Sequence, residues 1–316
     1  DLRCIPDAVQ PGALGDLKDF SSRYEVEGAD VGALRSIVWQ DESEAQTTAP
    51  RILLRRLKTG KLEGLPAKHE HPRKVEMPSR QVEAYERALA LKEIAGPEGT
   101  LGMIHALRRV SLHPSLLDGA GREGELKVEE SARFVAMMGV LDRIAPTHEK
   151  VLVFLESLDL QDADQLPLLL QRRYGLAKPP MVINGQVGTE VRQARVNAFQ
   201  RDRGFDVMLL SPKAGGVGLT LTAANHVIHL SRWWNPAVED QCSDRVYRIG
   251  QTKPVHIYYP LAVLPNAHER SFDMQLQILM ERKRKLARNL LAAPAFTRAD
   301  YAELVSATRA VSSEQP

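Results

Sequence analysis

The chain has 316 residues, enough for one large or two ordinary domains, and its 43% hydrophobic and 26% charged residues are typical of a globular protein. Its formal net charge is only +2, so any binding to nucleic acid must come from local basic clusters and not from the overall charge. The two cysteines, Cys4 and Cys242, lie far apart in the sequence, which indicates a reducing compartment and argues against a disulfide framework or a cysteine-based zinc site. No run of about 18 apolar residues occurs, so we expect no membrane span.

The first part of the chain has few strong structural signals. Residues 1–66 are rich in proline and glycine and read as irregular. Two amphipathic helices are predicted next, over 77–96 with Ser79 as the N-cap, and over 101–117 with an end before Pro114. The segment 118–125, with three glycines and four charges, is the best candidate for a linker.

Beyond this linker, short apolar runs alternate with helical patterns. Strands are predicted at 150–155, 180–185, 206–211, 226–231 and 254–262. Helices are predicted at 131–145, 163–175, 189–200 and 236–249, followed by a long charged helix over 267–289 and a shorter one near 298–309. This alternation predicts an α/β fold whose parallel sheet is covered by helices on both faces.

A glycine-rich loop directly follows one predicted strand. Ser211 and Lys213 open it, and Gly215, Gly216 and Gly218 follow. Ligands of open α/β sheets bind outside the carboxyl ends of the strands, and glycines there let backbone N–H groups approach a phosphate. The glycines alone are a weak signal, because a tight connection without a ligand gives the same pattern.

Two arginines lie three residues apart at the end of the helix predicted over 236–249. On that helix Arg245 and Arg248 share a face, and two adjacent guanidiniums repel each other unless an anion lies between them. The alternative is a solvated helix face on which they pair with nearby acidic residues. The glycine loop close by in the sequence favours the interpretation as a phosphate clamp.

Segment 211–251 resembles motifs V and VI of the Swi/Snf-type, superfamily-two helicase-like ATPases. The loop matches at Ser211, Ala214, Gly215, Gly216, Gly218, Leu221, Thr222 and Ala224, and it is followed by Trp234, Asn235 and Pro236. The last part matches at Gln241, Asp244, Arg245, Arg248, Ile249, Gly250 and Gln251. Ser231 stands where many members carry Asp, and Tyr247 stands where His is common.

The resemblance covers nearly the whole chain and implies its organisation. It implies the end of a first lobe with a helical protrusion over 1–117, a linker over 118–130, a RecA-like second lobe over 131–265, and brace helices over 266–316. No G-x-x-x-x-G-K-[ST] loop occurs in these residues. We therefore expect the P-loop, which with Mg²⁺ holds most of the ATP, to belong to an N-terminal RecA-like lobe of the same protein.

The resemblance also implies roles for the residues of motifs V and VI. Arg245 and Arg248 would be arginine fingers on the γ-phosphate, with Gln241 and Asp244 orienting them and Gly216 and Gly218 close to the nucleotide. Such fingers are worth about 10³–10⁵ in rate. The chain without its first lobe is then expected to be inactive.

Contacts with double-stranded DNA are expected to involve the backbone and to be independent of sequence. Candidates are Arg192, Arg195, Ser211, Lys213 and Trp234. Trp234 has an alternative role as a core aromatic residue, and the basic stretch 282–288 reads equally well as a solvated helix face. His69 and His71 lack a second ligand pair, so we expect no metal site, and His113 is interpreted as a helix-end contact.

Two other functions remain open from the sequence. The lobe could dock an accessory protein with a vestigial ATPase, or it could belong to an RNA helicase. The Trp-Asn-Pro and Arg-Ile-Gly-Gln details favour the DNA translocases. The composition favours a cytoplasmic protein of the prokaryotic nucleoid, or a nuclear one if the source is a eukaryote.

Overall fold

The computed structural model describes residues 65–95, 99–117, 126–213, 218–289 and 297–309, together with Asp16, Lys18, Ser22 and two short strands. These strands, β1 (Trp39–Asp41) and β2 (Leu53–Arg55), form a parallel pair within a unit made of residues 1–64 and 285–293. A second unit, 65–284 with 294–316, holds the other elements except the last residues of the helix that ends at Asn289. The linker predicted over 118–125 lies outside the described residues, as do Gly215 and Gly216.

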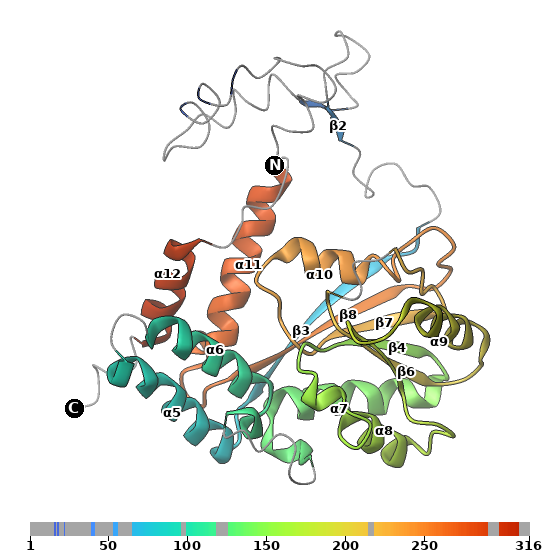
Figure 1. Ribbon diagram of the computed structural model, residues 1–316, viewed down its shortest axis with the longest axis horizontal. Helices are drawn as coiled ribbons and strands as arrows, with labels where there is room; N and C mark the ends of the chain where they lie inside the picture. The colour runs from blue at the N-terminus through green and yellow to red at the C-terminus, as the bar shows by residue number, and fades with distance from the viewer. Residues whose placement is uncertain are drawn as a thin grey trace. The chain divides into compact units, whose positions relative to one another are not determined.

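Six strands of the larger unit form one parallel sheet in the order β3, β8, β7, β4, β6, β5 (Figure 1). The strands are β3 (Lys68–Glu76), β4 (Lys150–Phe154), β5 (Met181–Ile183), β6 (Asp206–Leu210), β7 (Ala224–His229) and β8 (Val255–Val263). Five of them, β4 to β8, coincide with the strands predicted from short apolar runs. The parallel pairing confirms the predicted α/β fold.

Helices precede, connect and follow these strands. They are α5 (Ser79–Ala95), α6 (Gly99–Leu112), α7 (Ala132–Ile144), α8 (Leu166–Tyr174), α9 (Thr189–Arg201), α10 (Pro236–Ser243), α11 (Phe272–Asn289) and α12 (Arg298–Arg309). Single 3₁₀ turns lie at Pro114–Leu116, Val128–Glu130, Ala145–Thr147, Asp159–Gln161 and His268–Arg270. As expected, His113 acts at a helix end, because its side chain accepts a hydrogen bond from the Ser115 N–H.

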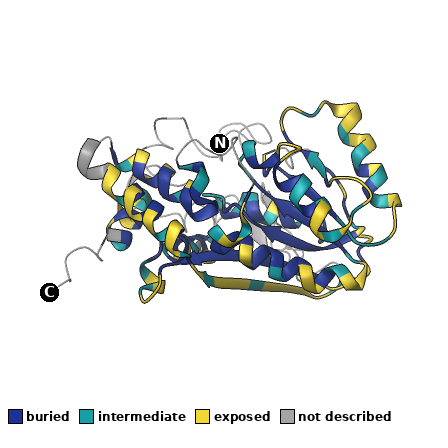
Figure 2. Cartoon of the chain, turned by 90° about the horizontal axis from the view of Figure 1, so that it is seen from below, coloured by how far each residue is buried: buried dark blue, intermediate teal, exposed yellow. Residues whose placement is uncertain are grey.

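Alternate residues of the central strands supply two separate cores. On one face Val151, Val153 and their neighbours pack against α7 and α8, and on the other Leu152 and Phe154 pack against α9 and α10 (Figure 2). All five residues of β4 are buried, which explains its apolar run over 151–154. Full burial of each such side chain contributes about 1.5–3 kcal/mol. A third core joins α5, α6, α11 and α12.

The edge strand β3 was not predicted from the sequence. Its residues, KHEHPRKVE, are mostly polar and mostly exposed, and they include Pro72. Proline is tolerated at a sheet edge, where its missing N–H is not needed by a second neighbour. β3 pairs with β8 along all nine residues, so the sheet includes a strand that precedes the predicted linker. The domain boundaries given above stay a prediction.

Two predicted helices have different bounds in the structure. The helix expected over 236–249 ends at Ser243, so the expectation that Arg245 and Arg248 share a helix face is wrong. Tertiary hydrogen bonds compete with the helix there, because the Arg245 carbonyl accepts from Leu221 N–H at 3.0 Å. The helix expected over 267–289 begins at Phe272, after a 3₁₀ turn.

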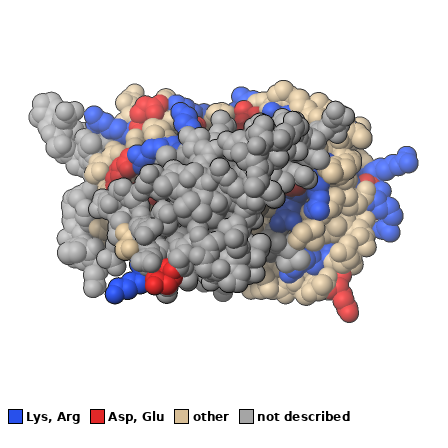
Figure 3. Space-filling model, turned by 90° about the horizontal axis from the view of Figure 1, so that it is seen from above, with Lys and Arg blue, Asp and Glu red and all other residues tan. Residues whose placement is uncertain are grey.

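The surface carries charges of both signs. Lys and Arg side chains occur in several groups on the described face in view, with Asp and Glu between them, in line with the small net charge (Figure 3). None of the helices that the structure describes is long and apolar enough to cross a membrane.

A ladder of imidazole rings crosses three strands. His69, His256 and His226 lie opposite one another on β3, β8 and β7, with ring centroids 5.1 and 5.3 Å apart. His71 adds a second rung, with its Nε2 3.1 Å from Nδ1 of His256. At the far end His226 lies 2.7 Å from Glu149, which also binds Lys253. Burial, and then the neighbouring rings, lower the pKa of His71 and of His256.

This ladder predicts how stability depends on pH. Three of its imidazoles, those of His71, His226 and His256, have folded-state pKa values below the unfolded value of about 6.5. Their contribution to stability is therefore complete above that pH and is lost as pH falls through the lowered values. We expect the free energy of unfolding to decrease on acidification below pH ~6.5, and His256→Gln to flatten this dependence. Urea unfolding between pH 5 and 8 measures it. The exposed His105→Gln is the control, and an equal acid loss in both variants would refute the assignment to the ladder.

Candidate functional site

Three loops meet at the carboxyl edge of the sheet. They follow β4, β6 and β7, and β4 lies between the other two strands. The chain passes from β6 on one side of β4 to β7 on the other, so the strand order reverses at this point. Such a switch point is where ligands of open α/β sheets bind. The structure thus places Ser211 and Lys213 at the edge predicted for them.

A chain of buried polar side chains ties the loop after β4 to the segments that follow β5 and β6. The Gln161 amide donates to Leu155 O at 2.6 Å and to Ser211 Oγ at 3.3 Å. Asn184 in turn donates to Gln161 Oε1 at 3.1 Å. Gln161, Asn184 and Ser211 are only 4%, 7% and 8% exposed. Because Ser211 Oγ accepts from Gln161, its own proton is left for another acceptor. No sequence pattern singled out Gln161 or Asn184.

Ser231 shows why the departure from the family pattern at this position is tolerated. Its Oγ accepts a hydrogen bond from the Glu156 N–H at 3.0 Å, and its N–H donates to Phe154 O at 3.1 Å. The side chain is needed here as an acceptor for a backbone N–H, a role that a hydroxyl and a carboxylate both fill. Ser231 therefore joins the ends of β4 and β7.

A buried carboxylate on α10 organises the segment that follows β7. Glu239, 1% exposed, accepts from Arg232 Nε at 2.8 Å, from Arg284 Nη2 at 2.9 Å and from the Trp233 N–H at 3.0 Å. Burial alone would raise the pKa of Glu239, but Arg232, His229 and Arg284 outweigh it and lower this pKa to about 2. Glu239 is thus a fixed negative charge that joins β7, α10 and α11.

Residues 244–251 form tight turns that place the two motif-VI arginines differently. Arg245 is 8% exposed, and its Nε is buried without a hydrogen-bond partner among the described residues. Burial lowers the pKa of the Arg245 guanidinium, and the positive charge of Arg248 adds to this effect. Arg248 and Gln241 are exposed, and Asp244 is half-buried. The segment thus pairs an unsatisfied buried guanidinium with an exposed one, which is an arrangement able to receive an anion.

Gln251 fastens these turns to the loop before β7. Its amide donates to Ala224 O at 2.7 Å and to Thr222 O at 3.2 Å, and its Oε1 accepts from the N–H groups of Thr252 and Lys253. The residue is 4% exposed. Gly250 beside it has φ of +97°, a conformation that favours glycine. The motif therefore ends in Gly-Gln because Gly250 adopts a positive φ and Gln251 binds the neighbouring backbone.

The DNA-contact candidates occupy different environments. Arg192 and Arg195 donate to the carbonyls of Val187 and Val182 near the end of β5, and Arg192 Nε is buried without a described partner. Lys213 is exposed, with its ammonium 5.7 Å from the Trp233 ring centroid.

Trp234 and the motif-V glycines complete the set of predicted residues. Trp234 is half-buried and packs edge-on against Phe272 and Tyr301, as its alternative role in the core requires. Gly216 lies outside the described residues, and a side chain at Gly218 would meet nothing within 4 Å. The roles predicted for all these residues stay predictions.

Known proteins share this organisation. Residues 136–250 match the helicase conserved C-terminal domain. Zorya protein ZorD of Escherichia coli is 34% identical over 95% of the chain and 28% of its own length. The putative ATP-dependent helicase/translocase YwqA of Bacillus subtilis is 29% identical over 90% of the chain and 30% of its own length. The chain therefore spans less than a third of the length of these relatives.

Solved structures agree with the fold. The C-terminal part of the Fun30 ATPase domain has a TM-score of 0.57 and 21% identity, covering 77% of this chain and 98% of that one. The Sulfolobus solfataricus SWI2/SNF2 ATPase core in complex with dsDNA has a TM-score of 0.57 and 23% identity, covering 88% of this chain and 56% of that one. The chain belongs to the Swi/Snf-type helicase-like ATPases. Its six-stranded sheet is their RecA-like second lobe.

In this Swi/Snf-type lobe, the contact between α11 and α10 gives a testable prediction. Arg284 bonds Glu239 and also Asp240, whereas Arg282, two residues earlier, pairs with Glu303 on the surface. Arg284→Ala leaves a buried carboxylate with one guanidinium fewer, and we expect a loss of about 1.5–3 kcal/mol in unfolding free energy. Arg282→Ala should cost less than about 1 kcal/mol. Chemical denaturation of both variants checks this, and equal losses would contradict the role given to Glu239.

Proposed function

We propose that this chain is the second motor lobe of an ATP-dependent double-stranded-DNA translocase, acting together with an N-terminal P-loop lobe. The single observation that carries the proposal is the pair of motif-VI arginines. Arg245 has a buried Nε without a described partner, and Arg248 is exposed on the same turns. Gln251 binds these turns to the start of β7, and Glu239 holds the preceding helix α10. Membership of the Swi/Snf-type family supports the choice of ATP as the ligand.

The residues present fit one side of an ATP site. Arg245 Nε and the Arg248 guanidinium would donate to phosphate oxygens, and Asp244 and Gln241 lie in the same segment to hold them. The described residues offer no cluster of three His, Cys, Asp or Glu side chains for a metal ion, and the sequence contains no P-loop. The proposed sites for Mg²⁺ and for most of the triphosphate therefore lie on the first lobe, and the chain alone would be inactive.

The chemistry asked of this lobe is electrostatic. Bound ATP with Mg²⁺ would supply the γ-phosphoryl group that is transferred to water. Arg245 and Arg248 would offset the negative charge that builds on its oxygens, a contribution of about 10³–10⁵ in rate for a well-placed finger. Gln251 would keep both arginines in register with the loop after β6, because its amide binds Thr222 O and Ala224 O at the end of that loop and Val246 O between the arginines.

Double-stranded DNA is the proposed track. Ser211, with a hydroxyl proton left to donate, and the exposed Lys213 lie at the carboxyl edge of the sheet. Arg192 and Arg195 lie near the end of β5, at the same edge. The name of one structural neighbour records a complex with dsDNA, which supports the same partner here. Contacts of this kind bind the backbone and carry no sequence preference.

The arginine roles can be tested in the full-length protein. Arg248→Ala should lower kcat for DNA-stimulated ATP hydrolysis by about 10³-fold, because the transition-state charge loses its donor. Arg245→Ala should act in the same direction. Arg143→Ala, an exposed arginine on α7, is the matched control. Steady-state phosphate release with duplex DNA and with duplex RNA as activators measures the effect.

Three results would contradict the proposal. The first is full activity in Arg248→Ala. The second is robust ATP hydrolysis by the isolated 316-residue chain, which would show that it contains a complete catalytic site without the P-loop lobe. The third is stronger activation by RNA, which would move the protein to the RNA helicases.

A further inference from the structure

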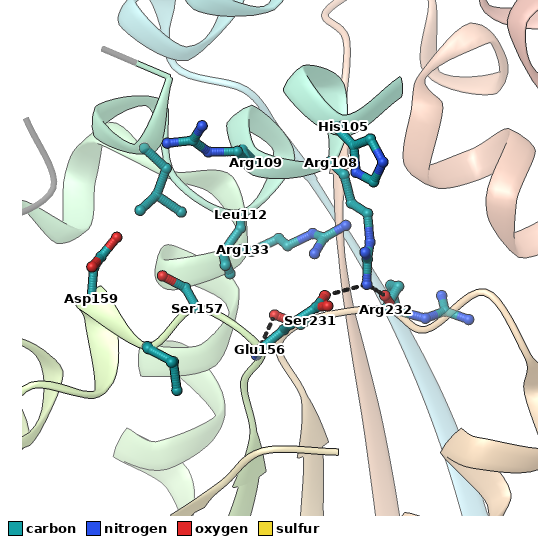
Figure 4. Close-up of a pocket in the computed structure, with 12 residues that line it drawn as sticks. His105, Arg108, Arg109, Leu112, Arg133, Glu156, Ser157, Asp159, Ser231 and Arg232 are labelled. Carbon is teal, nitrogen blue, oxygen red and sulfur yellow. Dashed lines mark hydrogen bonds and ion pairs between the residues drawn. The ribbon is translucent and has the colours of Figure 1, made fainter. Parts of the chain in front are cut away.

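A cavity of about 280 Å³ lies between α6 and the loops that follow β4 and β7 (Figure 4). It is separate from the motif-VI arginines, and none of the candidate residues predicted from the sequence lines it. Its lining is rich in cationic side chains, which come from α6 and from both loops. The charged and basic residues of the lining include His105, Arg108, Arg109, Arg133, Glu156 and Arg232.

Two arginines of the lining are already neutralised and build its wall. Arg133 forms a buried ion pair with Asp273, at 2.5 and 2.8 Å, and Arg232 pairs with Glu239. Arg133 also donates to Leu230 O at 2.9 Å, which fixes the end of β7. These guanidiniums shape the cavity and do not supply free charge.

The guanidinium of Arg108 is fixed in place at the mouth of the cavity. Its Nη2 donates to Glu156 and to Arg232 O, and its guanidinium carbon lies 5.4 and 4.8 Å from the ring centroids of Trp233 and Trp234. These contacts fix the plane of the guanidinium, while Nε and Nη1 have no hydrogen-bond partner among the described residues. Such a fixed fork suits the oxygens of a phosphate.

Two more basic side chains lie at the mouth of the cavity. His105 and Arg109 are exposed, lie one turn apart on α6, and form no hydrogen bond or ion pair within the described part of the chain. Figure 4 shows both on the α6 side of the cavity, with Glu156 across from them. Glu156 and Asp159 are the negative side chains of the lining, and Arg108 already offsets Glu156.

The positive side chains continue beyond the cavity. Trp233 has Arg108 within 5.4 Å of its ring centroid and Lys213 within 5.7 Å. Arg109, Arg108 and Lys213 therefore form a row from α6, past the end of β7, to the loop after β6. A row of separate cations along an edge matches the regular spacing of charge on a polymer better than it matches one small anion.

We infer that this row, with the cavity at one end, binds consecutive phosphodiester groups of a nucleic-acid strand. The inference rests on the proposed function and adds Arg109, Arg108 and His105 of α6 to the DNA contacts. Arg109 would bind a phosphate directly, Arg108 would present Nε and Nη1 to it, and Lys213 would meet the next phosphates along the strand. Trp233 would hold the spacing between Arg108 and Lys213.

The test measures DNA affinity of the full-length protein by titration of a labelled duplex at several salt concentrations. Arg109→Ala should weaken binding about fivefold, and the slope of log K against log salt should fall in magnitude by about 1. Glu156→Gln, which removes the opposing charge, should tighten binding. Arg143→Ala is the matched control, because it removes an exposed arginine about 15 Å further along α7 from the wall residue Arg133.

The outcomes separate this inference from the proposed function. If duplex DNA stimulates hydrolysis in the wild type but Arg109→Ala and Glu156→Gln bind as the wild type does, the inference is overturned and the proposed function stands. If DNA neither binds nor stimulates the wild type, both fail. If inorganic phosphate alone binds and Arg109→Ala abolishes that binding without changing duplex affinity, the site is for a free anion and the backbone assignment is overturned.

Discussion

The buried carboxylate of Glu239 is the interaction on which the edge of this lobe depends. Removing a carboxylate and a guanidinium from water costs several kcal/mol for each ion, and attraction compensates only when the geometry is good and the remaining lone pairs are bonded. Glu239 meets this condition with two guanidiniums and the Trp233 N–H. Since its partners come from β7 and α11, the pairing is satisfied in one arrangement of these elements only. The contact therefore specifies geometry more than it adds stability.

Polar side chains and isolated backbone bonds hold the carboxyl edge together. Past the last residues of β4, β6 and β7 the regular ladder gives way to single bonds, such as those from Leu155 N–H to Leu210 O and from Ser231 N–H to Phe154 O. Gln161, Asn184 and Ser231 take over by accepting or donating where a neighbouring strand would have done so. Each of these groups is satisfied, which an apolar residue at the same place could not achieve. These contacts cross-link the loops at this edge.

The sequence predicted the parts of the fold whose signal is local. Strands such as β4 contain an apolar run, here 151–154, because helices cover both faces of the sheet. This run alone was enough to predict them. β3 gave no such signal, since an exposed edge strand needs no apolar face and is held by its register with β8. The end of α10 could not be predicted either, because the groups that stop it, Leu221 and Gln251, lie outside the helix.

The residues of the candidate site also fall into those that the sequence predicted and those that only the structure shows. Arg245, Arg248 and the loop after β6 were found because they belong to one contiguous pattern. Glu239 is one of several acidic residues near the arginines in the sequence, and nothing in the pattern indicates that it is buried or that it binds Arg284, 45 residues away. Gln161 lies in a one-turn 3₁₀ helix without any motif, and its role follows only from the folded position of Ser211. The residues proposed to bind a ligand carry a pattern, whereas the residues that position them are revealed by three-dimensional contacts.

The two proposed ligand surfaces share one short piece of chain. The Trp233 ring lies between Arg108 and Lys213, on the side proposed for DNA, while the Trp233 N–H binds Glu239 at the start of α10. α10 leads directly to Arg245 and Arg248, on the side proposed for ATP. A shift of the Trp233 backbone would change its hydrogen bond to Glu239, and a rotation of α10 would act on the same bond. In the proposed motor, this buried ion-pair network would connect the surface proposed for ATP with the surface proposed for DNA.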